Sequence, residues 1–206
     1  MSLMQRLGKM GRFEIGSDTI RAFIAIELPD EISAFIRKIQ EGLKSYGFIA
    51  RWVRPENIHL TLKFLGDINK EDIKKAGDAI IRAASENASM SLGAKGIGFF
   101  PGVKRSRVIW TGIAGQTREL ADLHKTLDGK LETIGFPKEK RPFKGHLTIA
   151  RIKRKIDARR LIDAMKEFGR FESKTFIANE VVLFKSELKP SGAVYTKLMS
   201  ATLCAK

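Results

Sequence analysis

The sequence is poor in cysteine, in proline and in long apolar runs, and each shortage excludes a class of protein. Cys204 is the only cysteine among 206 residues, so the chain can form neither an internal disulfide nor a cysteine-based zinc site. No apolar run approaches the roughly 18 residues that would span a membrane, and residues 1–19 lack the apolar core of a secretory signal. Six prolines and 43% hydrophobic residues argue against a disordered or collagen-like chain. We therefore expect a folded, cytoplasmic protein without a membrane attachment.

Negative charge is also scarce. The chain has 38 Lys and Arg residues against 23 Asp and Glu residues, which gives a formal net charge of +15. A charge of this size favours a polyanionic partner, because a basic surface attracts phosphate-rich ligands over a distance. A generally basic host environment is the alternative explanation. The length fits one domain, or two small lobes that share a core.

Hydrophobic periodicity divides the chain into two units with the same order: strand, helix, strand, helix, strand. The first unit covers about residues 20–101 and the second about residues 106–203. Predicted strands are residues 20–27, 58–65, a segment ending near 101, 107–113, 145–152, 181–184 and 194–198, with the helices between them. Residues 1–19 are expected to form a poorly ordered extension. Two such units, related by a pseudo-twofold axis, would leave a cleft between them, and clefts of this kind bind ligands.

Two of the three histidines lie in nearly identical tetrapeptides, one in each unit. The motifs are His59-Leu60-Thr61-Leu62 and His146-Leu147-Thr148-Ile149. Because side chains alternate along a strand, the histidine and threonine of each motif share one face and the aliphatic pair shares the other. We expect the aliphatic pair to anchor each strand in the core and the polar pair to face the cleft. The third histidine, His124, lies beside a leucine stripe and is expected to be structural.

Two imidazoles in one cleft can act as an acid and a base. Their unperturbed pKa of about 6.5 lets one ring be neutral while the other carries a proton. Such a pair suits in-line displacement at phosphorus, in which the nucleophile loses a proton and the leaving oxygen gains one. The hydroxyls of Thr61 and Thr148 can donate to the non-bridging phosphate oxygens. The alternatives are two solvated edge strands, or a two-histidine metal site that lacks a carboxylate or cysteine at ligand spacing. We expect neither metal nor cofactor.

These motifs resemble the H-x-T-x motifs of the two-histidine phosphoesterase superfamily, and within it the RNA 2′,3′-cyclic phosphodiesterases, historically called 2′-5′ RNA ligases. The resemblance covers nearly all of the chain from Ile20 onward. Supporting segments are RAFIAIELP from Arg21, HLTLKFLGD from His59, FFP from Phe99, RVIW from Arg107, RPFKGHLTIAR from Arg141 and EVVLFKSELKPSGAVY from Glu180. Lys144-Gly145 departs from the family, in which a proline often precedes the second histidine.

The resemblance implies an α+β fold of two lobes, with largely antiparallel sheets around a V-shaped cleft. It implies hydrolysis of a terminal RNA 2′,3′-cyclic phosphate to a 2′-phosphate. We expect the partners to be tRNA or RNA fragments with such ends, and the protein to be a monomer. His59 would donate the proton to the leaving 3′ oxygen, His146 would accept one from water, and Thr61 and Thr148 would hold the phosphate. The reverse reaction with a 5′-hydroxyl would make a 2′-5′ linkage without ATP.

Several residues around the motifs are candidates for substrate binding. Lys63 shares strand parity with His59 and Thr61 and is expected to add positive charge to the cleft. The resemblance suggests a phosphate role for Arg151, although strict alternation places it opposite His146 unless a bulge intervenes. Candidates for contacts with the RNA phosphate backbone are Arg51, Arg54, Arg141, Lys144 and the basic run 151–160. Each of them is equally well explained as a solvated surface charge. Of the aromatic residues Phe64, Trp52 and Phe143, core packing is favoured over base stacking for all but one.

Two other functions remain open at this point. One is an RNA-binding module that recognises phosphate ends without turnover. The other is a phosphodiesterase for small cyclic nucleotides, 2′-5′ oligonucleotides or an ADP-ribose cyclic phosphate. The net charge of +15 favours a longer polyanion over these small substrates.

Overall fold

The computed structural model describes residues 19–190 and 192–205. Apart from Thr19, the expected N-terminal extension lies outside the described residues. The elements follow in the order β1 (Ile20–Glu27), α1 (Asp30–Ser45), β2 (Ala50–Trp52), η1 (Pro55–Asn57), β3 (His59–Ile68), α2 (Lys70–Ser85), β4 (Met90–Phe100), η2 (Val103–Arg105), β5 (Val108–Gly115), α3 (Thr117–Glu132), β6 (His146–Ile152), α4 (Ala158–Phe168), β7 (Phe176–Ala178), β8 (Glu180–Lys189) and β9 (Gly192–Thr202). The long strands and helices alternate as the periodicity predicts.

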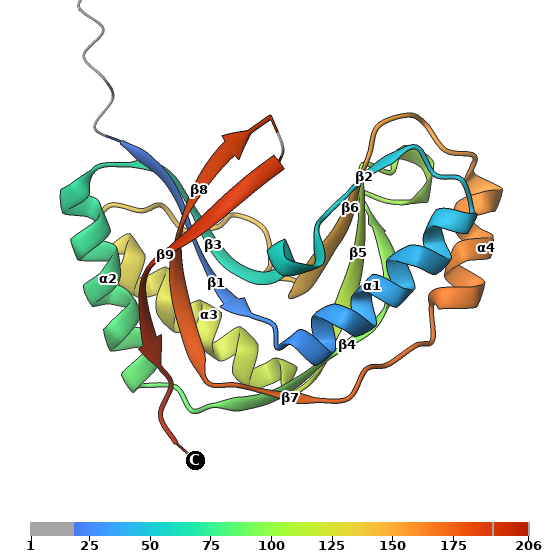
Figure 1. Cartoon of the computed structure of the whole chain (residues 1–206). Helices are drawn as coiled ribbons and strands as arrows, with labels where there is room; N and C mark the ends of the chain where they lie inside the picture. Colours follow the sequence, from blue (N-terminus) through green and yellow to red (C-terminus); the bar gives the residue numbers. More distant parts are fainter. Residues whose placement is uncertain (1–18, 191, 206) are drawn as a thin grey trace, which may run out of the picture.

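The strands form one sheet in the order β7-β4-β5-β6-β3-β1-β8-β9, with β2 paired to β6. Every strand pair is antiparallel. At its centre β3 and β6 share a single residue pair, Leu60 with Leu147, so the sheet divides there into two halves (Figure 1). These features confirm the α+β class and the antiparallel architecture with two lobes.

Each half of the sheet contains strands from both sequence units. β4, which ends the first unit, pairs with β5 of the second unit, and β8 of the second unit pairs with β1 of the first. The strand order is symmetrical about the centre, since β6, β5 and β4 on one side match β3, β1 and β8 on the other. Helices α2 and α3 lie beside the β1 half, and α1 and α4 beside the β5 half (Figure 1). The two units are therefore interlocked, because β4 of the first and β8 of the second each lie in the half of the sheet that is centred on the other unit.

A continuous hydrophobic core fills the space between the helices and the sheet. Each helix contributes apolar residues spaced three or four apart, the spacing that places side chains on one face. The buried stripes are Ile32, Ile36 and Leu43 of α1, Ala76, Ile80 and Ala83 of α2, Leu120, Leu123, Leu127 and Leu131 of α3, and Leu161 and Ala164 of α4. Ile162 and Met165 of α4 lie outside this buried stripe and are exposed.

Helix ends follow ordinary capping chemistry. The side chain of Asn69 accepts from the backbone N–H of Asp72 at the start of α2, and that of Asp157 accepts from the backbone N–H of Arg159 at the start of α4. At the start of α1 the cap position is occupied by Pro29, which makes no side-chain cap hydrogen bond, and Asp30 lies in the first turn of the helix.

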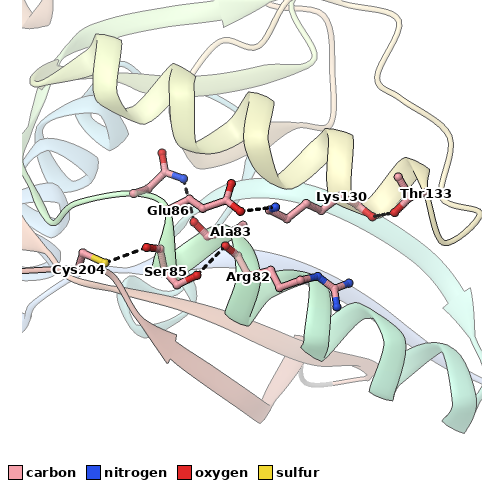
Figure 2. Close-up of polar contacts among 8 residues, drawn as sticks. Arg82, Ala83, Ser85, Glu86, Lys130, Thr133 and Cys204 are labelled. Atoms are coloured by element: carbon pink, nitrogen blue, oxygen red, sulfur yellow. Dashed lines mark hydrogen bonds and ion pairs between the residues drawn. The ribbon is translucent and has the colours of Figure 1, made fainter.

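Polar contacts at the C-terminal end of α2 connect this helix to α3 and to the C-terminal segment of the chain (Figure 2). Lys130 of α3 forms an ion pair with Glu86, at 2.6 Å. The Cys204 thiol donates to the carbonyl of Ser85, at 3.0 Å. No helix in the described ranges is long and apolar enough to cross a membrane.

A second, smaller cluster lies apart from the main core. It consists of Phe23, Ala25, Val182 and Phe184, with Tyr195 of β9 packed against it. The ring of His59 stacks on Phe23. This cluster is therefore the apolar support under one of the two motif histidines.

Candidate active site

The two motifs occupy the two central strands, β3 and β6. Their antiparallel pairing at Leu60 and Leu147 sets His59 across from Thr148, and Thr61 across from His146. Both leucines are fully buried, and the four polar side chains are half-buried. His59, Thr61 and Thr148 line a cavity of about 460 Å³. His146 is not among its lining residues. Its position next to the cavity follows from the strand register, which sets it across from Thr61.

The fourth residue of each motif is the extra residue of a β-bulge. In β3 the pairing with β1 skips Leu62, and in β6 the pairing with β5 skips Ile149. A bulge inverts the alternation of side chains beyond it. The pseudo-twofold repeat therefore includes the backbone irregularity as well as the side chains.

The bulge at Leu62 turns Lys63 into the protein interior. Lys63 is only 4% exposed, and its Nζ donates to Asp128 Oδ1 at 2.5 Å and to the Pro137 carbonyl at 2.7 Å. Our expectation that Lys63 adds positive charge to the cleft is therefore wrong. Strand parity fails here because the chain gains one residue between Thr61 and Lys63.

The same irregularity brings the next residue of each strand to the cavity. Phe64, 62% exposed, lines the cavity on β3, and the exposed Arg151 lines it on β6. Phe64 is therefore the one aromatic residue of the three for which core packing does not hold, the exception that the sequence left open. Core packing holds for Phe143, whose ring stacks on the structural His124 with centroids 4.0 Å apart. Trp52 is half-buried and also lines the cavity.

Buried polar groups from two helices fix the two bulges. Gln40 of α1 is 2% exposed and donates from Nε2 to the carbonyls of Val53 and Ile149, at 2.8 and 2.9 Å. Asp128 of α3 binds Lys63 beside the other bulge. Sequence reasoning missed both residues. Their only sequence feature is a polar side chain at a position that continues an apolar helix face.

Each motif histidine is oriented by a backbone carbonyl two residues before it. His59 Nδ1 lies 2.9 Å from the carbonyl oxygen of Asn57, and His146 Nδ1 lies 2.8 Å from that of Lys144. A carbonyl oxygen only accepts, so Nδ1 is the protonated nitrogen in both rings. Nε2 is left for proton transfer in both.

The surroundings of the two rings differ. His59 stacks on Phe23 with centroids 4.6 Å apart and meets Tyr195 edge-on at 5.3 Å. Burial lowers its pKa from 6.5 to about 4, against a smaller raising effect of the Asn57 hydrogen bond. His146 has only edge contacts, with Phe100 at 5.0 Å and Trp110 at 6.3 Å. At neutral pH the ring of His59 is therefore uncharged in the free protein.

Among the residues that the structure describes, the charged ones that line the cavity are all basic. They are Arg21, Arg51, Arg54 and Arg151. Of the other predicted basic residues, Lys144 places Nζ 4.3 Å from the centroid of the Trp110 ring, and Arg141 does not line the cavity. No group of three His, Cys, Asp or Glu residues in the described part of the chain is arranged to hold a metal ion.

An antiparallel fold with two H-x-T-x strands at the centre of a basic cavity defines a phosphoesterase of the two-histidine class. The family model described as LigT-like phosphoesterase matches residues 26–110 and 112–195. The chain belongs to this family, as the resemblance of its motifs implies.

Curated relatives and solved structures agree with the family. An RNA 2′,3′-cyclic phosphodiesterase of Methanocaldococcus jannaschii is 35% identical over 176 residues, covering 85% of this chain and 96% of the relative. One from Methanothermobacter thermautotrophicus is 31% identical over 179 residues, covering 87% and 96%. The crystal structure of TT0787 of Thermus thermophilus superposes with a TM-score of 0.77 at 27% identity, covering 91% and 100%. That of Escherichia coli LigT with 3′-AMP gives 0.72 at 25% identity, covering 90% and 98%.

Proposed function

We propose that this protein hydrolyses the 2′,3′-cyclic phosphate at the end of an RNA to a 2′-phosphate. The observation that carries the proposal is the antiparallel pairing of two H-x-T-x strands at Leu60 and Leu147, beside a cavity whose described charged lining residues are all arginines. The names of the curated relatives, and the 3′-AMP complex of Escherichia coli LigT, support an RNA substrate over other phosphoesters.

In the proposed reaction the two imidazoles move one proton each. Nε2 of His146 accepts a proton from water as its oxygen attacks phosphorus. The bond from phosphorus to the 3′ oxygen breaks, and Nε2 of His59 gives that oxygen a proton. The hydroxyls of Thr61 and Thr148 donate to the non-bridging oxygens, where negative charge increases in the transition state. Each proton transfer contributes about 10²–10⁴-fold.

The donor role requires His59 to gain a proton when the substrate binds. Its pKa of about 4 in the free protein leaves the ring neutral at pH 7. A bound cyclic phosphate places a negative charge beside the ring, and a neighbouring opposite charge raises the pKa of an imidazole. Proton uptake and substrate binding are therefore coupled in this proposal.

Neither a metal ion nor ATP is needed for these steps. Protons move between imidazoles, water and the 3′ oxygen, and the hydroxyl and guanidinium groups carry the phosphate charge. With an RNA 5′-hydroxyl in place of water as the nucleophile, the same groups would join two RNA ends through a 2′-5′ linkage, since the bond from phosphorus to the 3′ oxygen again breaks and that oxygen again receives a proton.

Mass analysis of a short RNA that ends in 2′,3′-cyclic phosphate, incubated with the protein in EDTA, tests the proposal. We expect a gain of one water and a phosphate on the 2′ oxygen. His59→Ala and His146→Ala should each lower the rate by about 10²–10⁴-fold. Thermal melting of both variants checks that they are folded. Full turnover by a folded His59→Ala protein would refute the mechanism, and tight binding of unchanged RNA would favour a non-catalytic RNA-end-binding module.

A further inference from the structure

Two arginines lie directly opposite each other at one end of the cavity. Arg51 of β2 and Arg151 of β6 are cross-strand partners in the antiparallel pair. Both are exposed, and both line the cavity together with His59 and Thr148. Like charges in directly opposed positions repel, so this pairing is unfavourable in the protein by itself.

No carboxylate in the described part of the chain offsets this repulsion. Neither Arg51 nor Arg151 belongs to any of its ion pairs. Both side chains lie near enough to Tyr195, beside His59, to lower the pKa of its hydroxyl against the larger raising effect of burial. Two guanidinium groups thus face the catalytic end of the cavity without a protein anion between them.

The cyclic phosphate alone does not account for these two charges. It carries one negative charge, and the threonines and histidines of the motifs already surround its proposed position. Thr148 and Arg151 are three residues apart on β6, which is at most about 10 Å along the strand. This is the scale of one nucleotide step along single-stranded RNA. A second phosphate of the same molecule can therefore lie at the arginines while the first lies at the motifs.

We propose that Arg51 and Arg151 form a second phosphate subsite. Because a 2′,3′-cyclic phosphate closes the 3′ end, every further phosphate of the RNA lies on its 5′ side. The nearest is the phosphodiester that joins the terminal nucleotide to its neighbour. Guanidinium groups bind phosphate oxygens through paired hydrogen bonds, and two of them enclose one phosphate. The subsite selects oligonucleotides over mononucleoside cyclic phosphates.

The hairpin of β8 and β9 closes this end of the cavity. A Cβ built on Gly192 would lie 3.6 Å from Nη2 of Arg51, and the carbonyl of Ala193 accepts from Nδ2 of Asn57 at 2.9 Å. Asn57 also provides the carbonyl that orients His59. The hairpin therefore lies beside Arg51 and holds Asn57, the residue that orients His59, and all of them line the same cavity, which places the subsite next to the proposed position of the reacting phosphate.

This inference rests on the proposed function, and three substrates test the two separately. They are adenosine 2′,3′-cyclic phosphate, adenylyl-adenosine with the same cyclic end, and that dinucleotide with a neutral methylphosphonate as its internal linkage. For the unchanged protein we expect kcat/KM to be at least 10-fold higher with the charged dinucleotide than with the neutral one. In Arg51→Gln and Arg151→Gln this ratio should fall towards one. Arg82→Gln, a matched change on α2 away from this cavity, should keep the ratio.

Each outcome has a distinct meaning. Equal hydrolysis of both dinucleotides by the unchanged protein would overturn the subsite and leave the proposed function standing. Equal losses on all three substrates in the arginine variants would assign these residues to the cyclic phosphate and also overturn the subsite. Hydrolysis of none of the substrates would overturn the proposed function. Calorimetric binding of the two dinucleotides ending in 2′-phosphate would then still decide the subsite, since only a charged internal linkage should strengthen binding.

Discussion

The two halves of the active site share a motif and a bulge but differ in what surrounds them. The His59 half has an aromatic cluster beneath the imidazole, a buried ion pair beside the bulge and Phe64 at the cavity. The His146 half has edge contacts to its imidazole, a neutral amide at the bulge and Arg151 at the cavity.

This comparison distinguishes the features that both halves share from the features that only one half has. Both halves keep the imidazole with Nδ1 on a carbonyl, the hydroxyl two residues on, and the extra residue that re-aims the strand. In the proposed mechanism, those shared features are the minimum for a symmetrical pair of proton-transfer groups around one phosphate. The features that are not shared give the two halves different surfaces: the His59 half offers aromatic side chains, and the His146 half offers positive charge.

The largest effect should come from breaking the ion pair beside the first bulge. Asp128→Ala leaves the Lys63 ammonium buried and unpaired, which typically costs about 3–5 kcal/mol of unfolding free energy. Gln40→Leu, at the other bulge, should cost about 1 kcal/mol, because it removes neutral hydrogen bonds only. Urea unfolding measures both, and Asp122→Ala on the exposed face of α3 is the control.

A double variant makes this comparison sharper. Lys63→Met with Asp128→Leu removes both charges, so it should recover most of the stability that Asp128→Ala loses. If Asp128→Ala unfolds no more easily than Asp122→Ala, the ion pair does not hold the bulge. If the double variant is stable but its kcat falls, the pair positions the motif strand in addition to stabilising it.

The next effect concerns the residue that each bulge turns to the cavity. Phe64 is 62% exposed there, and stacking of one base on an aromatic side chain is worth about 1–3 kcal/mol. Phe64→Ala should therefore raise KM for a short cyclic-ended RNA by about 5–100-fold. Ile177→Ala, at an equally exposed apolar residue of β7 outside the cavity, is the control. A substrate without its terminal base should respond to neither change, and a loss with that substrate would mean that Phe64 supports the strand instead of a base.

These residues also mark how far the sequence could predict the molecule. The strand and helix order, the buried stripes and the two motifs follow from local periodicity, which the structure confirms for most elements. Lys63 was misplaced because alternation holds only in regular strands, and nothing in HLTLKF distinguishes a strand with a bulge from a regular strand. Arg151 lines the cavity for the same reason. The sequence shows that this placement requires a bulge in the strand, but it does not show that the bulge exists.

Long-range pairing accounts for what the sequence left out. Tyr195 reaches His59 from the last strand, and Gln40 reaches Ile149 across 109 positions of the chain. The exchange of β4 and β8 between the halves is likewise set by which strand edges meet in three dimensions. Local patterns carry no information on such pairings, so these contacts become visible only in the folded chain.

The smallest effect should appear in the pH dependence of kcat/KM for the free protein. The imidazole pair works only while at least one ring is able to accept a proton. Because burial lowers the pKa of His59 to about 4, kcat/KM should fall as the pH drops through about 4, well below the 6.5 of an exposed imidazole. Tyr195→Ala opens one side of this ring to water, so the acid limb should move upward towards 6.5.

Phe100→Ala removes the corresponding ring edge beside His146 and is the matched control. It should leave the acid limb near 4, because it does not change the burial of His59. The two rings titrate as a pair, so the profile reports the environment of the site and not which ring donates. An acid limb that moves equally in both variants would mean that the aromatic cluster under His59 does not set its protonation. The contrast between the two halves would then be one of shape alone.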